Sequence, residues 1–288
     1  MSEQSDKVVL GTPDEVTGAL RSTVTALLRP PAGAPLRALE AGAGKRIRLD
    51  VPDDAYLVGV DTDGTAMGLN PRLHERVVGD LHDYAAPPDS FDLITCWYVL
   101  EHVERPEVLI GRFARMIAPG GLVVLAVPHL WSPKSLFTKL TPHAFHVWFR
   151  RHVLGFPNAG KPGYGPYPTT LRRSIAPAAI AALVARHGLA PVFEGYFEDE
   201  KQARFRRRLG ITGRRWSLVR GLVRALSLGR LDAARTEYVV VLRRDPAGAQ
   251  YSTRSGRLAQ AVNGATRSPA SAWTTGTSHS SRGLANRS

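Results

Sequence analysis

The sequence predicts an α/β fold in which seven mostly parallel strands form one sheet with helices on both faces. Short, continuously apolar runs separated by turns recur from residue 36 onward, as expected of strands buried on both faces. A segment of helical period over 106–117 lies between two of these runs, and such alternation is typical of a parallel sheet. The 288 residues are 43% apolar, which suffices for a large core.

The expected elements can be placed in order along the chain. The first is a helix over Pro13–Arg29, because Thr12 can cap it and apolar residues repeat at helical spacing. Two later helices are expected over 106–117, which is stopped by Pro119 and the two glycines after it, and over 177–187, which is followed by Gly188. Strands are expected at Leu36–Ala41, Tyr56–Val60, Arg76–Val78, Phe91–Cys96, Leu122–Val127, Leu189–Phe197 and Glu237–Arg243.

Composition divides the chain into three parts. Residues 1–35 form an N-terminal helical extension, 36–244 the main domain, and 245–288 a tail too poor in large apolar residues to fold. Within the main domain, 129–173 interrupts the strand and helix alternation after the fifth strand with many aromatic, Pro and Gly residues. Long loops of this kind are usually functional, so we expect a lid that contacts the substrate.

Positive charge is concentrated late in the chain. The formal net charge is +13, yet residues 1–130 hold 12 basic and 18 acidic residues, whereas 201–244 hold 13 basic and 2 acidic. The segment 201–230 has ten basic residues and no acidic one, interleaved with apolar residues. Such an amphipathic segment suits an anionic membrane surface or an acidic partner. Nucleic acid is a second option, which the absence of a nucleic-acid motif disfavours, and a solvated helix face is the third.

Several classes of protein are disfavoured. The longest apolar run, Ala178–Ala185, is far shorter than the ~20 residues that a membrane-spanning helix needs. The single cysteine, Cys96, excludes an internal disulfide and a multi-thiolate metal site, so we expect no structural metal and a buried thiol. Because the N-terminus is polar and lacks a signal-peptide pattern, we expect a cytoplasmic protein that could lie at the membrane periphery.

Acidic residues and glycines stand where three successive strands end. Glu40 closes the first strand and is followed by Gly42 and Gly44, which allow a sharp turn and a close approach of a ligand to the backbone. Asp61 ends the second strand, 19 positions beyond Gly42, where ribose hydroxyls bind in nucleoside-binding sheets. Asp80 follows the third strand. The run after Gly44 lacks the third glycine of G-x-G-x-x-G, which disfavours a nicotinamide dehydrogenase.

This ordered set of motifs resembles the class I S-adenosylmethionine-dependent methyltransferases, in particular the small-molecule branch with a generic methyltransferase domain. The resemblance covers about 36–128, and it implies a Rossmann-like fold and S-adenosylmethionine as cofactor. Arg46 stands where the family often has a third glycine, and the family's usual first helix is squeezed into 45–52. The resemblance further implies a cofactor site with Glu40, Gly42 and Gly44 under the methionine part, Asp61 on the ribose, Asp80 and Leu81 beside the adenine, and Trp97 near the reactive end.

Methyl transfer needs alignment and, for a weakly nucleophilic hydroxyl, a base. The candidate bases are His102, after the fourth strand, and His143 and His146 on the lid. Each also has a structural interpretation, as the start of a helix for His102 and as aromatic packing for the lid pair. The favoured function is methyl transfer to an oxygen or nitrogen of a small or lipid-linked metabolite. The alternatives are a methyltransferase of RNA or another polyanion, and a non-catalytic S-adenosylmethionine-binding protein.

Overall fold

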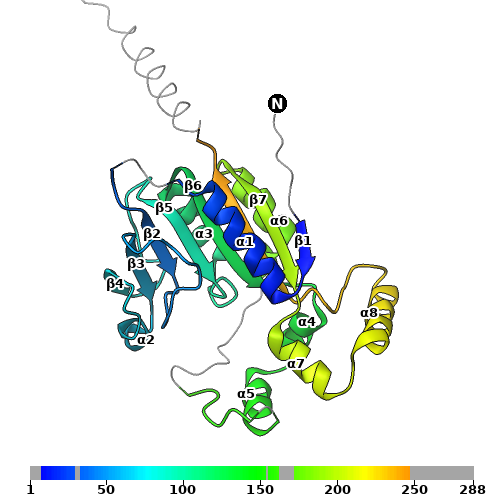
Figure 1. The fold of residues 1–288 in the computed structure, drawn as a ribbon. Coiled ribbons are helices and arrows are strands. Elements are labelled where there is room, and N and C mark those ends of the chain that lie inside the picture. Colours follow the sequence, from blue (N-terminus) through cyan, green and yellow to red (C-terminus); the bar gives the residue numbers. More distant parts are fainter. Residues whose placement is uncertain (1–7, 30–32, 154, 162–171, 247–288) are drawn as a thin grey trace, which may run out of the picture. The chain divides into compact units, whose positions relative to one another are not determined.

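A computed structural model describes residues 8–29, 33–153, 155–161 and 172–246, so the expected tail lies almost wholly outside the described residues. Its centre is one eight-stranded sheet (Figure 1). The strands lie in the order β1-β7-β8-β6-β5-β2-β3-β4. Their bounds are β1 Val8–Gly11, β2 Arg37–Ala41, β3 Tyr56–Asp61, β4 Glu75–Val78, β5 Phe91–Trp97, β6 Ile117–Pro128, β7 Leu189–Phe197 and β8 Glu237–Arg244.

The sheet is mostly parallel, as predicted. Only β8 runs antiparallel to its neighbours β6 and β7, and every other adjacent pair in the described sheet is parallel. The seven strands expected from the sequence are all present, and the fold class is confirmed. The apolar runs that predicted the central strands are buried because both faces of the sheet are covered.

The sheet has one strand more than predicted, because Val8–Gly11 forms β1 at its edge. The pairing partners of β1 lie in β7, from Val8 opposite Glu194 to Gly11 opposite Phe197. Immediately after it, Thr12 and Glu15 form a reciprocal capping box at the start of α1, Pro13–Leu27. A four-residue strand at the edge of a sheet is too short to give a clear hydrophobicity pattern, whereas the capping residues of α1 are recognisable in the sequence.

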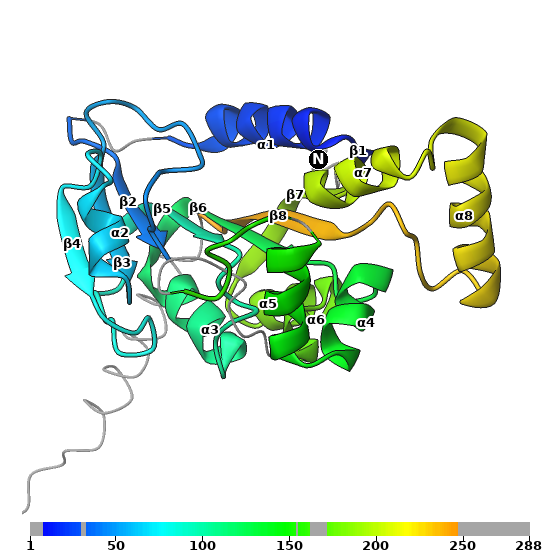
Figure 2. The same ribbon diagram turned by 90° about the horizontal axis from the view of Figure 1, so that it is seen from below.

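Helices cover the two faces of the sheet unequally. On one face α1 packs through Val16, Leu20 and Val24, with the single-turn helix α2, Gly64–Gly68. On the other face lie α3, Pro106–Met116, and α6, Pro177–Ala185, which follows the 3-10 turn Arg173–Ile175. Figure 2 shows α1 on the opposite side of the sheet from α3 and α6. Helices on both faces therefore match the prediction.

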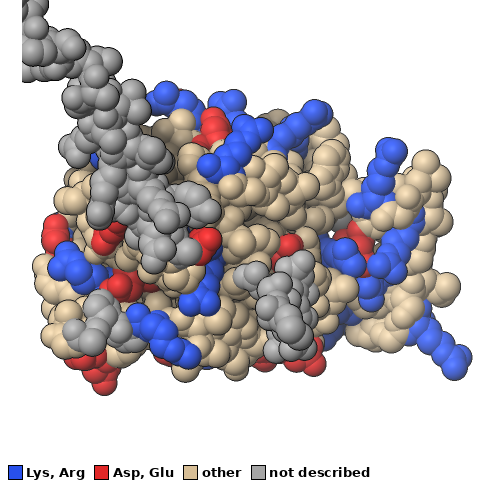
Figure 3. All heavy atoms as spheres, turned by 90° about the horizontal axis from the view of Figure 1, so that it is seen from above, with Lys and Arg blue, Asp and Glu red and all other residues tan. Residues whose placement is uncertain are grey.

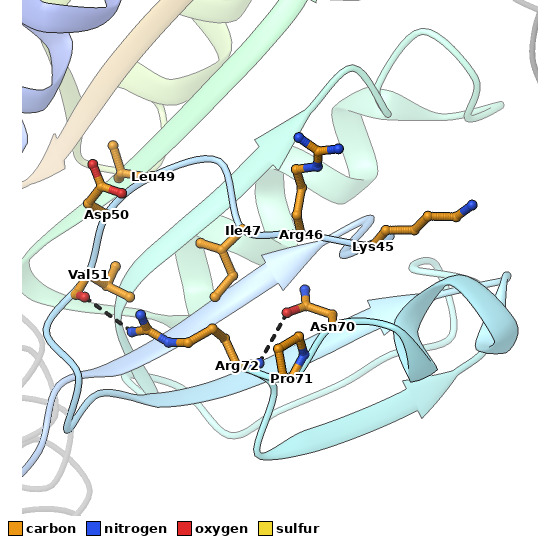
Figure 4. A pocket seen from close by; sticks show the side chains of 9 residues that line it. All are labelled: Lys45, Arg46, Ile47, Leu49, Asp50, Val51, Asn70, Pro71 and Arg72. Atoms are coloured by element: carbon orange, nitrogen blue, oxygen red, sulfur yellow. Dashed lines mark hydrogen bonds between the residues drawn. The ribbon is translucent and has the colours of Figure 1, made fainter.

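The segment 45–52, where the family's first helix is expected, contains no helix. Leu49 and Val51 are buried against the same face as α1 and fill the place of a helix there. Arg72 donates hydrogen bonds of 3.2 and 3.1 Å to the backbone carbonyls of Val51 and Pro52 and so fixes the loop. Figure 4 shows the hollow between this loop and 70–72. Side-chain contacts and one guanidinium thus hold a segment that lacks helical hydrogen bonds.

Two long connections leave the sheet at the edge where the parallel strands end. The predicted lid follows β6 and contains α4, Pro133–Leu140, and α5, His143–His152, before the chain returns at α6. The basic segment joins β7 to β8 and forms α7, Glu200–Arg208, and α8, Gly213–Leu226. Figure 1 shows all four helices beyond this edge. None of the helices among the described residues is long and apolar enough to cross a membrane.

Candidate active site

The strand order reverses direction between β2 and β5. From β2 the chain continues outward through β3 and β4, and then crosses to β5 on the other side of β2. In open α/β sheets, ligands bind outside the carboxyl ends of the strands at such a switch point. Gly42, Asp61 and Trp97 therefore stand at the ends of β2, β3 and β5, at the part of the sheet best suited to bind a ligand.

Glu40 is a buried carboxyl on β2. Its side chain is 4% exposed, and its Oε2 accepts a 2.7 Å hydrogen bond from the hydroxyl of Thr95. Oε1 has no hydrogen-bond partner among the described residues. Burial raises the pKa of Glu40 to about 7, although the Thr95 hydrogen bond and the charge of Arg48 oppose the shift. An orphaned oxygen at this depth favours a cationic or hydrogen-bond-donating ligand.

The two glycines make the turn that the sequence predicted. Gly42 has φ +76° and Gly44 has φ +50°, both in the left-handed region. The backbone N–H of Gly42 donates a 2.8 Å hydrogen bond to the carbonyl of Val60 on β3. A Cβ on Gly42 would also collide with Cγ2 of Val99. Glycine at 42 is thus required both by the backbone conformation and by the loop that follows β5.

Asp61 ties the glycine turn to the next strand. Its Oδ2 accepts a 2.9 Å hydrogen bond from the N–H of Gly44, and its Oδ1 accepts one of 2.9 Å from the N–H of Asp63. These two bonds fix the carboxylate at the end of β3. A carboxylate oxygen has two lone pairs, so each oxygen can accept one further hydrogen bond.

Asp80 and Leu81 follow β4, where the sequence placed them. Oδ1 of Asp80 accepts a 2.7 Å hydrogen bond from the N–H of His82 and lies 3.0 Å from its Nδ1. The backbone bond from His82 is the largest reason why the pKa of Asp80 is lowered, and the ring contact adds to it. Leu81 is buried in the core. Asp80 is therefore ionised near neutral pH and bound to His82 in the loop that follows β4.

Trp97 and Tyr98 end β5. The indole Nε1 of Trp97 is buried without a hydrogen-bond partner among the described residues. Tyr98 has φ +58°, a strained conformation for a non-glycine residue, and its N–H donates to the carbonyl of Ala126 on β6. The guanidinium of Arg48 lies 5.7 Å from the centre of the Tyr98 ring. Neither Tyr98 nor Arg48 was singled out in the sequence, because a positive φ and a contact across a loop leave no pattern.

The three predicted histidines lie in two different places. His102 is half-buried after β5, with its Nε2 3.8 Å from Oε1 of the buried Glu101. His143 is exposed as the first residue of α5, and His146 on the same helix has its Nε2 2.8 Å from Oγ1 of Thr141. The structure thus places His102 with the strand ends and the lid pair on α5.

His129 is a further histidine at this edge, one residue beyond β6. Its ring packs edge-on against Tyr196, with ring centres 5.5 Å apart. Burial is the main cause of its lowered pKa, which the charge of Arg235 lowers further and a hydrogen bond to the Arg235 backbone opposes. Nδ1 has no hydrogen-bond partner among the described residues. His129 is therefore neutral near pH 7; its position after the fifth predicted strand was the signal that the sequence analysis did not use.

Other groups near the sheet carry no comparable chemistry. Cys96 is fully buried on β5, and burial raises the pKa of its thiol well above the usual range, as expected of a structural residue. No group of three or more His, Cys, Asp or Glu residues suited to a metal ion occurs in the part of the chain that the structure describes. The hollow of Figure 4 is lined by 45–47, 49–51 and 70–72, and none of the three strand-end carboxylates lines it.

Residues 15–192 match the model of a family described as "Methyltransferase domain". This segment is more than half of the chain and spans all the strand-end residues described above.

Curated relatives include two enzymes named "Ubiquinone biosynthesis O-methyltransferase". The protein from Photobacterium profundum is 29% identical over 129 residues, which are 38% of this chain and 54% of the relative. The protein from Burkholderia vietnamiensis is 33% identical over 98 residues, or 30% of this chain and 42% of the relative. The chain thus spans about half the length of the curated relatives it matches. Among solved structures, a SAM-dependent methyltransferase from Archaeoglobus fulgidus has 14% identity and a TM-score of 0.45, covering 81% of this chain and 95% of its own.

Proposed function

Because the chain belongs to the class I S-adenosylmethionine-dependent methyltransferases, we propose that it transfers a methyl group to an oxygen atom of a small or lipid-linked metabolite. The observation that carries the proposal is the set of strand-end residues at the switch point, where Glu40, the glycine turn and Asp61 stand together. When bound, S-adenosylmethionine supplies an electrophilic methyl group on a sulfonium, so the protein has mainly to orient the two reactants.

The methionine end of the cofactor carries an ammonium and a carboxylate, and the chain offers a complementary pair. We assign the ammonium to Glu40, whose Oε1 has no hydrogen-bond partner among the described residues and whose pKa is raised by burial, so that a bound cation would favour its ionised form. We assign the carboxylate to Arg48, whose charge acts on both Glu40 and Tyr98. The buried, unpartnered oxygen of Glu40 supports this fit, because a buried polar atom without a partner is costly.

The nucleoside end is assigned to the next two strand ends. Asp61 keeps one lone pair on each oxygen after its bonds to Gly44 and Asp63, which suits two adjacent ribose hydroxyls. Asp80 and Leu81, after β4, are assigned to the adenine, and Trp97 to the neighbourhood of the reacting methyl group.

The acceptor is proposed to bind between the strand ends and the lid. The two curated relatives are named as O-methyltransferases, which favours oxygen over nitrogen as the atom methylated. A hydroxyl must lose its proton during the transfer, and His102 is our first candidate base because the Glu101 carboxylate 3.8 Å away can orient its ring. His143 and His146 are the alternatives on the lid.

Calorimetric titration with S-adenosylmethionine and S-adenosylhomocysteine tests the cofactor assignments. Asp61→Asn should weaken binding more than tenfold, on the order of 2 kcal/mol, because it loses the charge that accepts the ribose hydroxyls. Asp54→Asn is the matched control, since Asp54 is exposed before β3 and thus at its opposite end. Equal affinity of all three proteins would overturn the role of Asp61.

A screen of hydroxylated and amino acceptors, with S-adenosylhomocysteine formation as the readout, tests the acceptor assignment. We expect turnover with hydroxyl compounds, and a loss of at least tenfold in kcat for His102→Gln with unchanged cofactor affinity. Turnover confined to amines would replace oxygen by nitrogen. Full activity of His102→Gln beside inactive His143→Gln or His146→Gln would move the base to the lid.

A further inference from the structure

The helix α8 exposes a line of leucines on its outer side. Leu218, Leu222 and Leu226 follow one another at intervals of four residues, and Leu228 stands just beyond the helix. Their exposed fractions are 73%, 61%, 79% and 83% respectively. Residues four apart lie on one side of an α-helix, so the first three form a continuous apolar stripe. Large apolar side chains gathered in this way on a surface usually mark an interaction site.

The opposite side of α8 holds it to the protein. Its partly buried residues are Trp216, Arg220, Val223 and Ser227. Arg220 donates hydrogen bonds of 3.1 and 3.0 Å to the two carboxylate oxygens of Asp232, and Arg224 lies 3.1 Å from the same carboxylate. These inner contacts fix the rotation of α8 about its axis, so the leucine stripe faces away from the protein.

The arginines divide in the same way between inner and outer positions. Arg206 binds Glu198 through two hydrogen bonds and stacks on Trp216 at 4.4 Å. By contrast, no ion pair is found within the described residues for five exposed arginines of α7, of α8 and of the turn after it: Arg207, Arg208, Arg214, Arg215 and Arg230. Figure 3 shows basic side chains gathered at the end of the molecule that α7 and α8 form. Since 201–230 contains no acidic residue, these outward charges are not neutralised locally.

We propose that α8 docks on the surface of an anionic phospholipid bilayer. The leucine stripe would enter the boundary between headgroups and acyl chains, and the outward arginines would contact lipid phosphates. An interfacial helix needs this combination of an apolar face and flanking cations, since each alone gives weak binding. The proposal is independent of the acceptor, because a bilayer can recruit the enzyme whatever hydroxyl it methylates.

Charge and shape favour a bilayer over the other occupants of such a surface. RNA would contact the arginines but leave the aliphatic stripe in water, and the one aromatic residue of α8, Trp216, is covered by Arg206. A second copy of the chain would bring two sets of unpaired arginines together. The connection that carries α8 also leaves from the edge of the sheet that holds the candidate active site.

Vesicle flotation with the full chain tests the proposal. The probes are phosphatidylcholine vesicles with and without about one third phosphatidylglycerol. One variant combines Leu218→Ser, Leu222→Ser and Leu226→Ser, and a second combines Arg214→Glu and Arg215→Glu. The charge-matched control combines Arg115→Glu and Arg186→Glu, at exposed positions of α3 and just after α6. Arg206 is left unchanged, because its bonds to Glu198 make it structural.

We expect the wild type and the control to float with anionic vesicles and to sediment with neutral ones. Both α8 variants should lose at least tenfold in the bound fraction, and high salt should weaken wild-type binding. Each variant should keep the wild-type thermal midpoint and cofactor affinity, so that failure to float is separable from failure to fold or to bind S-adenosylmethionine. Equal flotation of wild type and variants would overturn the proposal. RNA binding lost only in the arginine variant, or self-association lost in the leucine variant, would also overturn it in favour of that partner.

Discussion

The hydroxyl of Thr95 on β5 donates a 2.7 Å hydrogen bond to the buried carboxyl of Glu40 on β2, and the two residues are direct partners in the pairing of these strands. This bond satisfies one carboxyl oxygen and leaves the other without a partner among the described residues. Burial outweighs the bond and raises the pKa of Glu40 to about 7. Glu40 is thus only partly ionised at neutral pH until a cation binds beside it.

Cofactor affinity should depend on pH through Glu40. If its carboxylate binds the ammonium of S-adenosylmethionine, affinity should rise as pH increases from about 6 to 7.5, because the carboxyl ionises across this range. Glu40→Gln should bind about tenfold more weakly at pH 7.5 and lose the dependence. Titration calorimetry at four pH values measures both effects. Thr95→Val is the matched variant: without the hydroxyl, the rise in affinity should shift to higher pH. A flat profile for the wild type would contradict the assignment of Glu40.

Glu40 should also make the stability of the cofactor-free protein depend on pH, but stability should fall as pH rises, whereas cofactor affinity should increase. The pKa of Glu40 is raised on folding from 4.5 to about 7, so the folded state holds a proton that the unfolded state has released between these values. Stability contributed by the protonated carboxyl is therefore lost as pH rises from about 4.5 to 7. Glu40→Gln, which cannot ionise, should become more stable than the wild type by on the order of 2 kcal/mol above pH 7. Urea unfolding at pH 5 and pH 8 checks this, and an equal difference at both values would contradict it.

Alanine substitutions in the glycine turn should separate two reasons for glycine: a collision with a neighbouring side chain and a positive φ. Alanine at 42 must adopt a positive φ and also displace Val99, whereas alanine at 44 meets no atom within 4 Å and faces only the positive φ. Gly42→Ala should cost about 3 kcal/mol of stability and Gly44→Ala about 1 kcal/mol. Adding Val99→Ala to Gly42→Ala should recover the steric part. Thermal unfolding of the three variants decides the point, and equal losses at 42 and 44 would exclude a role for Val99.

The sequence predicted the elements whose cause is local. Buried parallel strands are recognisable in the sequence as apolar runs. The acidic residues at the ends of these runs, Glu40, Asp61 and Asp80, lie at or just after the ends of the strands, as predicted. The chain order of these strands, together with the family resemblance, led to the right fold class, because parallel strands impose one carboxyl edge. The insertion predicted after the fifth strand does follow β6, and its role as a lid stays a prediction. Its helices α4 and α5 were not expected, since aromatic and Pro residues obscured their period.

The features that could not be predicted from the sequence depend on contacts between residues far apart in the chain. The edge strand β1 is defined by its pairing with β7, not by its own four residues. The loop over 45–52 is held by Arg72 from another part of the chain. Whether a histidine lies beside a carboxylate, as His102 does beside Glu101, or packs edge-on against a tyrosine, as His129 does, follows only from the folded arrangement.

Asp232 should control the attachment of α8. Its buried carboxylate accepts two hydrogen bonds from Arg220 and lies within 4 Å of Arg224 and Arg235. Burial opposes ionisation of Asp232, but the Arg220 bonds, the N–H of Ala234 and the nearby guanidinium charges outweigh it and lower the pKa. The stability that this carboxylate gives is therefore present above its unfolded pKa of 3.8 and is lost as pH falls through the lower pKa of the folded state.

Asp232→Asn should release α8 at neutral pH, at a cost of about 2 kcal/mol, because it leaves partly buried arginines without their counter-charge. Hydrogen exchange should then quicken in α8 and stay unchanged in α1, whose capping box is independent of Asp232. Equal exchange of α8 in the variant and the wild type would show that the partly buried Trp216 and Val223 suffice to hold the helix without the ion pairs.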